Sequence, residues 1–276
     1  MKQDYPDAPY LCNLAKRCGY VIVANFNLGM KKEWKADNTP LTITDTAINS
    51  DVCAAIQRDY PHIRVVGEEE SSASKIENPE YIILCDPVDG TIPFSHGLPV
   101  STFCIAVLKD GTPLVGVIYD PFMKRMWHAE RTKGSFLGSA KVRVSNTTAL
   151  RHAMIYAALL HSNVLTSSLY NPLSVIHELM KNEAITIDMH SIAYFGGLVA
   201  SGEFDATIYP ITHGWETAAM HIIVEEASGK ATDIYGNNIR YNPQGEVQGH
   251  IISNGKVHDK LVELVQKCLS IESTGL

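Results

Sequence analysis

The apolar residues of this chain follow helical spacing in some segments and strand-like spacing in others. From Ala8 to Gly29 they recur every three or four positions, which predicts a long amphipathic helix that opens the chain and stops at Gly29. The same spacing from Asp45 to Tyr60 predicts another helix, ended by Pro61. Further helices are expected at residues 173–180, 192–201, 216–228 and 257–269.

Short runs rich in β-branched residues predict strands between these helices. The expected strands cover residues 64–67, 81–86, 101–108, 113–120, 126–130, 206–210 and 250–254. Because no repeat, low-complexity tract or linker interrupts the pattern, we expect one compact unit. It would comprise an N-terminal α+β subdomain at 1–145 and a C-terminal α/β subdomain at 146–276, with sheets and helices stacked in layers.

Composition and charge narrow the class of protein. Of the 276 residues, 45 % are hydrophobic, which is enough for a sizeable core. A formal charge of −7 argues against bulk nucleic acid as a partner. No stretch approaches the ~20 apolar residues of a bilayer helix, so we expect no membrane association and a cytoplasmic location. The six scattered cysteines form no CxxC pair, which favours buried thiols over a disulfide framework or a zinc site.

Three acidic segments carry the candidate chemistry: GEEE at 67–70, DPVDGT at 86–91 and GWETAAMHIIVEEASG at 214–229. Asp86 closes an apolar strand, and Pro87 is expected to prevent its continuation as an inner strand. Asp86 and Asp89 should then lie at the carboxyl end of a strand, beside the free amides of a short helix. Since hard cations take oxygen ligands and phosphate binds helix N-termini, the segment predicts both halves of a metal–phosphate site.

Several common catalytic signatures do not occur in the sequence. The spacing of Asp86 and Asp89 differs from the D-x-D of phosphatases that use an aspartyl nucleophile. The motifs GxxxxGK[ST], GxGxxG, GxSxG and HExxH are also absent, which removes the common nucleotide-loop, serine-hydrolase and zincin interpretations.

In this order and at these separations, the acidic segments resemble the inositol monophosphatase family of magnesium-dependent, lithium-sensitive phosphatases. The resemblance extends over nearly the whole chain and includes KADNTPLTITD at 35–45 and HGLPVSTFCIAVLKDGTPLVGVIYDP at 96–121. It implies the layered αβαβα sandwich shared with sugar phosphatases, and a homodimer as the usual assembly. It also implies hydrolysis of a small phosphate monoester by direct attack of a metal-activated water.

Residue by residue, the resemblance implies a site for two or three Mg²⁺ ions. The implied ligands are Glu68, Asp86, the carbonyl of Val88, Asp89 and Glu216. Such a cluster repels itself unless divalent cations are bound, so Mg²⁺ should stabilise the fold. Metal ions at this place would neutralise phosphoryl charge and lower the pKa of water.

The remaining roles also follow from the resemblance. Asp45 and the Thr91 hydroxyl would orient the attacking water, with Glu68 completing the catalytic set. The amides of Gly90 and Thr91 would hold the phosphate. Lys35 matches a basic residue on a mobile loop over the site and is expected to contact substrate.

Two departures from the family pattern concern the late helix and the strand before it. The helix normally opens with Trp-Asp, whereas this chain has Trp215-Glu216. The extra methylene moves the carboxylate by roughly 1–1.5 Å, although Mg²⁺ demands near-ideal ligand distances. We predict that Glu216 still ligates a metal. Seven residues earlier, Tyr209 stands where inositol phosphatases often carry a substrate-binding glutamate.

The substrate pocket departs from the pattern as well. His190-Ser191-Ile192 replaces the usual Gly-Ser/Thr-Ala near the sugar. We predict substrate contacts from His190, Ser191, Tyr209 and His213. The preferred substrate is a small polyol or sugar monophosphate. 3′-Phosphoadenosine 5′-phosphate and histidinol phosphate remain alternatives, because KADNTPLT with WETAA resembles phosphatases of the first, and GLPVSTFCIAVLKDG resembles phosphatases of the second.

Each candidate also has a purely structural interpretation. Asp45 could be the N-cap of its helix, Thr91 could cap the short helix, and Trp215 could be a core wedge. Glu69 and Glu70 are expected outside the ligand set. A catalytically impaired homologue that binds metal or phosphate is the alternative to an enzyme, but retention of the whole acidic set with Thr91 favours the enzyme.

Overall fold

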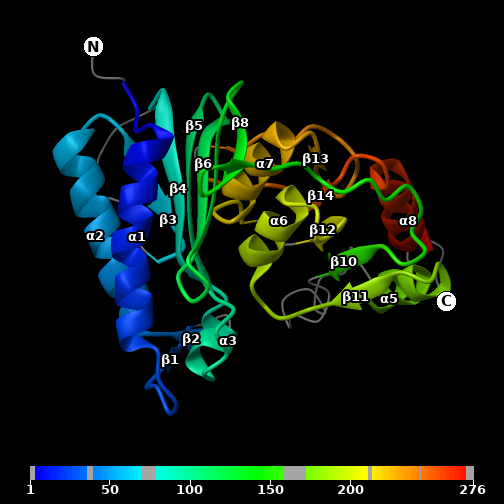
Figure 1. Cartoon of the computed structure of the whole chain (residues 1–276), viewed down its shortest axis with the longest axis horizontal. Coiled ribbons are helices and arrows are strands. Elements are labelled where there is room, and N and C mark those ends of the chain that lie inside the picture. The colour runs from blue at the N-terminus through cyan, green and yellow to red at the C-terminus, as the bar shows by residue number, and fades with distance from the viewer. Residues whose placement is uncertain are drawn as a thin grey trace.

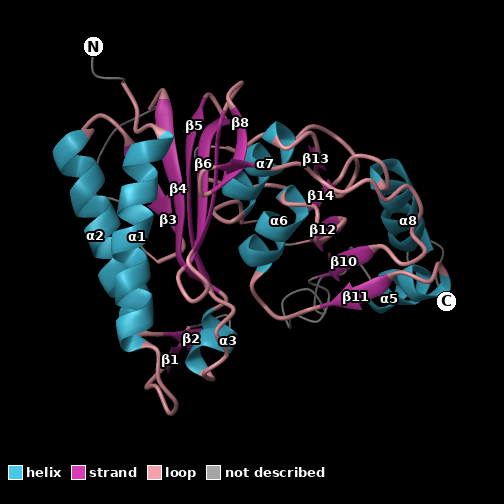
Figure 2. Cartoon of the chain, viewed as in Figure 1, coloured by secondary structure: helices cyan, strands magenta, loops and turns pink. Residues whose placement is uncertain are grey.

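Helices and sheets alternate in five layers along the long axis of the molecule (Figures 1 and 2). The structure, a computed structural model, describes residues 4–35, 40–69, 79–157, 172–210, 213–242 and 244–271. The described helices are α1 (Ala8–Asn25), α2 (Ile43–Asp59), α3 (Thr91–Ser95), α5 (Pro172–Lys181), α6 (Ile192–Ala200), α7 (Thr217–Glu226) and α8 (His258–Ile271).

The strands form two main sheets and a small hairpin. The hairpin pairs β1 (Glu33–Trp34) with β2 (Pro40–Leu41). The larger sheet has the order β3 (Arg64–Gly67), β4 (Tyr81–Asp89), β5 (Thr102–Lys109), β6 (Thr112–Asp120), β7 (Arg125–Glu130), β8 (Gly134–Leu137), β9 (Ala140–Lys141). The smaller sheet has the order β11 (Ile185–Ile187), β10 (Met154–Ala157), β12 (Ala206–Tyr209), β14 (His250–Ser253), β13 (Lys230–Thr232).

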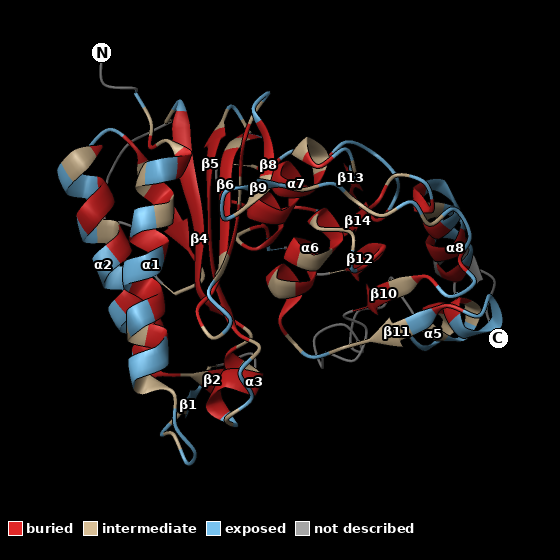
Figure 3. Ribbon diagram, in the orientation of Figure 1, coloured by how far each residue is buried: buried red, intermediate tan, exposed pale blue. Residues whose placement is uncertain are grey.

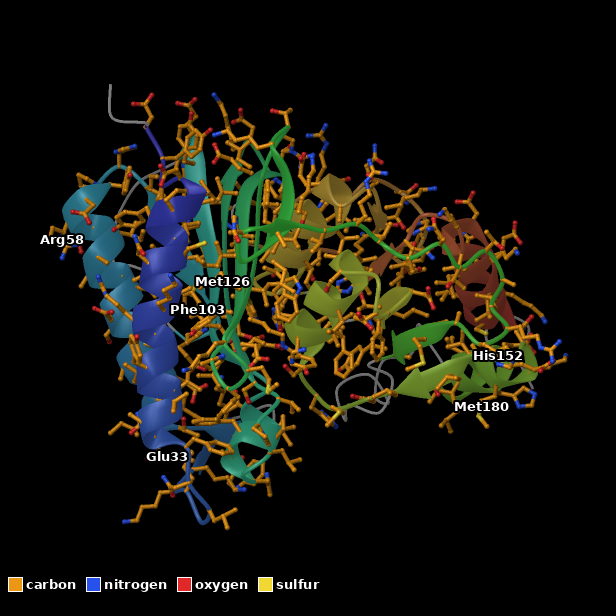
Figure 4. All side chains as sticks on the ribbon, in the orientation of Figure 1. Glu33, Arg58, Phe103, Met126, His152 and Met180 are labelled. Carbon is orange, nitrogen blue, oxygen red and sulfur yellow. The ribbon has the colours of Figure 1, made fainter. Side chains whose placement is uncertain are left out.

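Three hydrophobic cores hold the layers together. The first lies between the pair α1 and α2 and the larger sheet, the second surrounds α6 and α7 between the two sheets, and the third lies between the smaller sheet and the pair α5 and α8. Figure 4 shows Phe103 and Met126 between α1 and the larger sheet, whereas Arg58 and Met180 point outward at opposite ends. This sequence of layers is the expected αβαβα sandwich.

Burial distinguishes the inner helices from the outer ones (Figure 3). α1 and α2 expose one face each, as their amphipathic patterns predict. α7 is buried along residues 217–224, which fits a helix enclosed by sheets on both sides. Within the described residues, no helix combines the length and the apolar character that a bilayer crossing requires. All six cysteines are free thiols, and four of them are buried.

The ends of the two N-terminal helices differ from the sequence prediction. α1 ends at Asn25 with Phe26 as its C-cap, short of Gly29. α2 begins at Ile43, and its N-cap is Thr42 rather than Asp45. Asp45 is the third helical residue of a capping box, in which Thr42 and the Asp45 carboxylate satisfy each other's backbone amides. The Asp45 carboxylate is therefore fixed before any other partner is considered.

The prediction that Asp86 closes its strand was wrong, whereas the prediction that Pro87 prevents its continuation as an inner strand was confirmed. β4 continues to Asp89, and its pairing with β5 shifts register between Asp86 and Asp89. Proline is tolerated at such a bulge because no ladder hydrogen bond is needed there. On the other side, β3 pairs only as far as Cys85. The bulge thus places Asp86 and Asp89 at the open end of the strand.

The sequence pattern missed several short strands. β8, β9, β10, β11 and β13 were not expected, nor was the hairpin of β1 and β2. Each has two to four residues, too few for an alternation of apolar and polar residues to be recognised.

The boundary between two subdomains that we expected at residue 145 stays a prediction. The larger sheet ends at Lys141 and the smaller one begins at Met154.

His250 is a buried polar link between the smaller sheet and the start of α7. Its Nε2 lies 3.2 Å from the Thr207 hydroxyl, and its Nδ1 lies 2.9 Å from the Thr217 hydroxyl. Burial, aided by the charge of His221, lowers the pKa of His250 to about 3. An unfolded histidine titrates near pH 6.5. Below that pH the unfolded chain binds a proton that folded His250 refuses, so acid favours unfolding.

We therefore expect His250→Asn to reduce the loss of stability on acidification. Between pH 7.5 and pH 5 the wild-type chain should lose about 2 kcal/mol of unfolding free energy through His250, and the variant should not. Denaturant unfolding at a series of pH values measures the difference. His152→Asn, an exposed exchange of the same type, is the control. Equal pH dependence in His250→Asn and the wild type would contradict the prediction.

Candidate active site

A cleft of about 310 Å³ lies where the ends of β4 and β12 meet the starts of α3, α6 and α7. Its walls bring together segments that are far apart in the sequence. The lining residues are Lys35, Pro40, Glu68, Asp86, Val88, Asp89, Gly90, Thr91, Ile92, Tyr156, His190, Ile192, Tyr209, His213, Trp215 and Glu216. Of the sequence-predicted site residues, only Asp45 and Ser191 are not among them.

Asp86 and Asp89 leave the bulge of β4 toward the cleft. The Asp86 Oδ1 accepts a hydrogen bond from the Val88 amide at 2.9 Å, which fixes the turn between the two carboxylates. The Asp89 Oδ2 accepts three hydrogen bonds, from the Thr102 hydroxyl at 2.9 Å, the Ser191 hydroxyl at 2.6 Å and the Ala193 amide at 3.1 Å. Both side chains are almost fully buried.

Ser191 therefore supports Asp89 directly. It is fully buried at the N-cap of α6, and its hydroxyl is used by the Asp89 carboxylate. The substrate contact expected of Ser191 stays a prediction. The Asp89 bond explains why a small hydroxyl residue suits this position, because a longer side chain would displace α6 from the end of β4.

Asp45 lies behind the cleft wall, in contact with Thr91. The Thr91 Oγ1 lies 3.2 Å from Asp45 Oδ1 and 2.9 Å from the Val88 carbonyl oxygen. A hydroxyl has one proton to donate, so it serves one of these acceptors at a time. Burial, only partly offset by the Thr42 hydrogen bonds, raises the pKa of Asp45. The capping box and the Thr91 contact coexist, so the structural interpretation of Asp45 does not exclude a chemical one.

Lys35 bridges two carboxylates at the opposite wall. Its Nζ lies 2.9 Å from Glu68 Oε1 and 2.5 Å from Glu69 Oε1. Burial lowers the pKa of Lys35, but the attraction of Glu68 and Glu69 outweighs it and the net shift is upward. Burial raises the pKa of Glu69 to about 7 despite that contact. Glu70 and residues 36–39 of the segment KADNTPLTITD lie outside the described residues.

Glu216 enters the cleft from the N-cap of α7. Its Oε1 accepts a hydrogen bond from the Tyr209 hydroxyl at 3.4 Å. Its Oε2 is buried and has no hydrogen-bond partner among the described residues. A buried carboxylate oxygen without a donor is costly, because water has been removed and nothing replaces it. This oxygen is thus left available for a cation.

The carboxylates of the cleft raise one another's pKa. Burial is the largest cause at Asp86, followed by repulsion from Glu68 and Glu216, and the pKa lies well above its usual range. Burial and then Glu68 and Asp89 do the same to Glu216. Burial raises the pKa of Asp89 to about 6, although its hydroxyl donors oppose the shift. Lys35, the one lysine or arginine among the described residues that line the cleft, neutralises only part of this charge.

These donors fit a hard divalent cation. They are carboxylate oxygens and a backbone carbonyl, the ligand types that Mg²⁺ prefers, and Glu216 supplies an oxygen without a donor. Among the described residues, no three acidic, histidine or cysteine side chains already stand as a finished ligand set. The ligand geometry would therefore form as the cation binds.

Gly90 shapes the floor of the cleft. Its φ of +84° is a left-handed conformation that glycine adopts without strain. A Cβ at this position would lie 2.8 Å from the Ser191 Cβ, so α6 can approach only because the side chain is absent. The turn delivers the amides of Gly90 and Thr91 to the start of α3, beside the acidic cluster.

Aromatic side chains form another part of the wall, and the sequence predicted only some of them. His213 stacks on Trp215 with ring centroids 4.3 Å apart and an interplanar angle of 11°. His190 lines the cleft from a backbone with φ of +55°. Tyr156 was not a candidate, because β10 itself was not expected. Its hydroxyl donates to Asp188 Oδ1 at 3.1 Å. For Trp215, the signal available in the sequence was its position next to Glu216.

This chain is similar to known proteins over most of its length. The family model of the inositol monophosphatase family matches residues 6–270. A histidinol-phosphatase of Mycobacterium tuberculosis is 32% identical over 255 residues, which cover 90% of this chain and 94% of that protein. A 3′(2′),5′-bisphosphate nucleotidase CysQ of Buchnera aphidicola is 32% identical over 251 residues, or 86% and 88% of the two chains.

Solved structures show the same fold. The extragenic suppressor protein suhB of Bartonella henselae has a TM-score of 0.83 at 23% identity, covering 93% of this chain and 97% of that chain. An IMPase of Thermotoga maritima has a TM-score of 0.81 at 24% identity, covering 96% and 98%. The chain therefore belongs to the inositol monophosphatase family of metal-dependent phosphatases, and it is a hydrolase of phosphoric monoesters.

Proposed function

We propose that this chain is a Mg²⁺-dependent phosphomonoesterase that hydrolyses a small polyol or sugar monophosphate by direct attack of water. One observation carries the proposal. A buried acidic cluster with an unpartnered Glu216 oxygen lies in the same cleft as Thr91, which contacts Asp45 at 3.2 Å. The residues that would hold a cation and Asp45, which would accept a proton, would thus lie together beside the bound phosphate.

Glu68, Asp86, Asp89, Glu216 and the Val88 carbonyl would hold the metal, in two or three positions. When bound, Mg²⁺ supplies a Lewis acid that neutralises phosphoryl charge and lowers the pKa of water. The remaining contributions come from the chain itself. Hydrogen bonds from Thr102, Ser191 and Ala193 orient Asp89 before any ligand arrives.

Asp45 and Thr91 would orient the attacking water. Thr91 Oγ1 lies within reach of both Asp45 Oδ1 and the Val88 carbonyl oxygen. A water at this hydroxyl can pass its proton toward Asp45 as it attacks, because the carboxylate is held in place by Thr42. The Gly90 and Thr91 amides would hold the phosphate, and Lys35 would face its remaining charge.

The alcohol portion of the substrate would occupy the aromatic part of the cleft. The hydroxyls of Tyr156 and Tyr209 donate to Asp188 and Glu216, and each keeps capacity to accept from a substrate hydroxyl. With the His190 imidazole, they offer polar contacts to a polyol or sugar. The volume of the cleft, about 310 Å³, suits a molecule of that size.

A second substrate class is favoured by the stacked His213 and Trp215. Flat aromatic walls suit a planar ring, as in histidinol phosphate or 3′-phosphoadenosine 5′-phosphate. The Mycobacterium tuberculosis relative bears the name of the first activity and the Buchnera aphidicola relative that of a bisphosphate nucleotidase. We further infer a homodimer and sensitivity to lithium from the family resemblance, and a cytoplasmic location from the sequence pattern.

A substrate panel tests the proposed function. Phosphate release in the presence of Mg²⁺ should be measured with inositol 1-phosphate, hexose monophosphates, histidinol phosphate and 3′-phosphoadenosine 5′-phosphate. We expect the highest kcat/KM with a polyol or sugar ester. If histidinol phosphate or 3′-phosphoadenosine 5′-phosphate gives the highest kcat/KM, and His213→Ala lowers kcat/KM for that substrate alone, the second substrate class is correct. No release from any ester would contradict the phosphatase activity.

Removing the charge of Asp45 should slow catalysis. Asp45→Asn keeps an acceptor for the Thr42 amide but cannot take a proton, so kcat should fall about 10²–10⁴-fold. Steady-state kinetics measures the effect. Asp51→Asn is the matched control, since Asp51 lies on the same helix and is exposed in an ion pair with Arg17. A similar kcat in Asp45→Asn and the control would exclude the proposed role.

Mg²⁺ should raise the melting temperature by relieving repulsion in the acidic cluster. At a Mg²⁺ concentration ten times its dissociation constant, the gain is about 1.4 kcal/mol, or about 3–5 °C. Thermal unfolding with and without Mg²⁺, at constant ionic strength, measures the increment. Asp86→Asn should reduce it. A melting curve indifferent to millimolar Mg²⁺ would tell against the cation site.

A further inference from the structure

Tyr209 and Glu216 are two positions at which this chain departs from the family pattern, and the structure places them in contact. The Tyr209 hydroxyl lies 3.4 Å from Glu216 Oε1. We propose that Tyr209 is a positioning residue for Glu216: its hydroxyl holds one carboxylate oxygen, so that the other, Oε2, faces the cation. The two replacements then form one functional unit. This inference rests on the metal-dependent function proposed above.

The position of the Tyr209 hydroxyl is fixed by packing. Tyr209 is the last residue of β12 and pairs with His250 of β14. Only 7% of its surface is exposed, and its ring lies 5.5 Å from the His250 ring. A tyrosine has two side-chain torsions, and both are constrained when the ring is enclosed. The hydroxyl therefore offers a donor whose position is fixed by the sheet.

Glu216 needs such a fixed donor more than an aspartate would. Its backbone is held at the N-cap of α7, and the side chain makes no capping hydrogen bond. The longer side chain has one more torsion, so its carboxylate has more positions to choose from. A hydrogen bond to Oε1 removes that freedom and leaves Oε2, which has no partner among the described residues, in a defined place.

Charge supports the same pairing. A glutamate at this position, which inositol phosphatases often carry, would add another carboxylate beside Glu216, whose pKa burial and then Glu68 and Asp89 already raise. Tyr209 supplies a neutral donor instead. The extra methylene of Glu216 and the hydroxyl of Tyr209 thus compensate each other in length and in charge.

A double-mutant cycle tests the unit through Mg²⁺ binding, measured by calorimetry without substrate. Tyr209→Phe should weaken Mg²⁺ binding about tenfold, the size expected for loss of a partner behind a metal ligand. In a Glu216→Asp background the same substitution should change binding less than about twofold, because the shorter side chain falls out of reach of the hydroxyl. Melting curves without Mg²⁺ show that each variant is folded.

Tyr10→Phe is the matched control, because the Tyr10 hydroxyl donates to the Asp59 carboxylate at 2.8 Å, between α1 and α2. It should leave Mg²⁺ affinity unchanged in both backgrounds. An equal loss from Tyr209→Phe in both backgrounds, or no loss in the wild type, would overturn the unit. A wild-type chain that binds no Mg²⁺ would instead refute the metal-dependent function itself.

Discussion

Like charges buried at the junction of the layers are the constraint on which the site depends. Asp86 and Glu216 have pKa values well above their usual ranges, first through burial and then through repulsion by their neighbours. A fold that placed these groups together without a counter-charge would be less stable, because the buried carboxylates repel one another. Lys35 supplies one positive charge at the rim. The acidic cluster is therefore suited to a cation, in agreement with the metal dependence of the family.

The surrounding layers make this arrangement possible by fixing backbone rather than side chains. The bulge at Pro87 turns the end of β4 so that both of its aspartates reach the cleft. The left-handed turn at Gly90 lets α6 approach until Ser191 touches Asp89. His250 ties the smaller sheet to the start of α7, where Glu216 stands. Each of these contacts lies between segments far apart in the sequence.

Two relatives of this chain, equal in their identity to it, are named for different substrates: one is a histidinol-phosphatase and the other a bisphosphate nucleotidase. In this structure the acidic end of the cleft is built from β4, α3 and α7, whereas His190, His213 and Tyr156 come from loops and a short strand. The two ends of the cleft thus come from different elements of the fold.

The sequence by itself determined the long helices, the longer strands and the residues of the acidic cluster. Helical and alternating periodicities are local properties, and DPVDGT with its companions is a local pattern that the family shares. Only the tertiary structure decided that Pro87 lies at a bulge, that Thr42 rather than Asp45 caps α2, and that Ser191 supports Asp89. It alone joined Tyr209 to Glu216. The Ser191–Asp89 contact joins residues 102 positions apart, which spacing along the chain does not reveal. The contacts between near neighbours depend on the backbone geometry that the packed layers impose, which local periodicity does not reveal either.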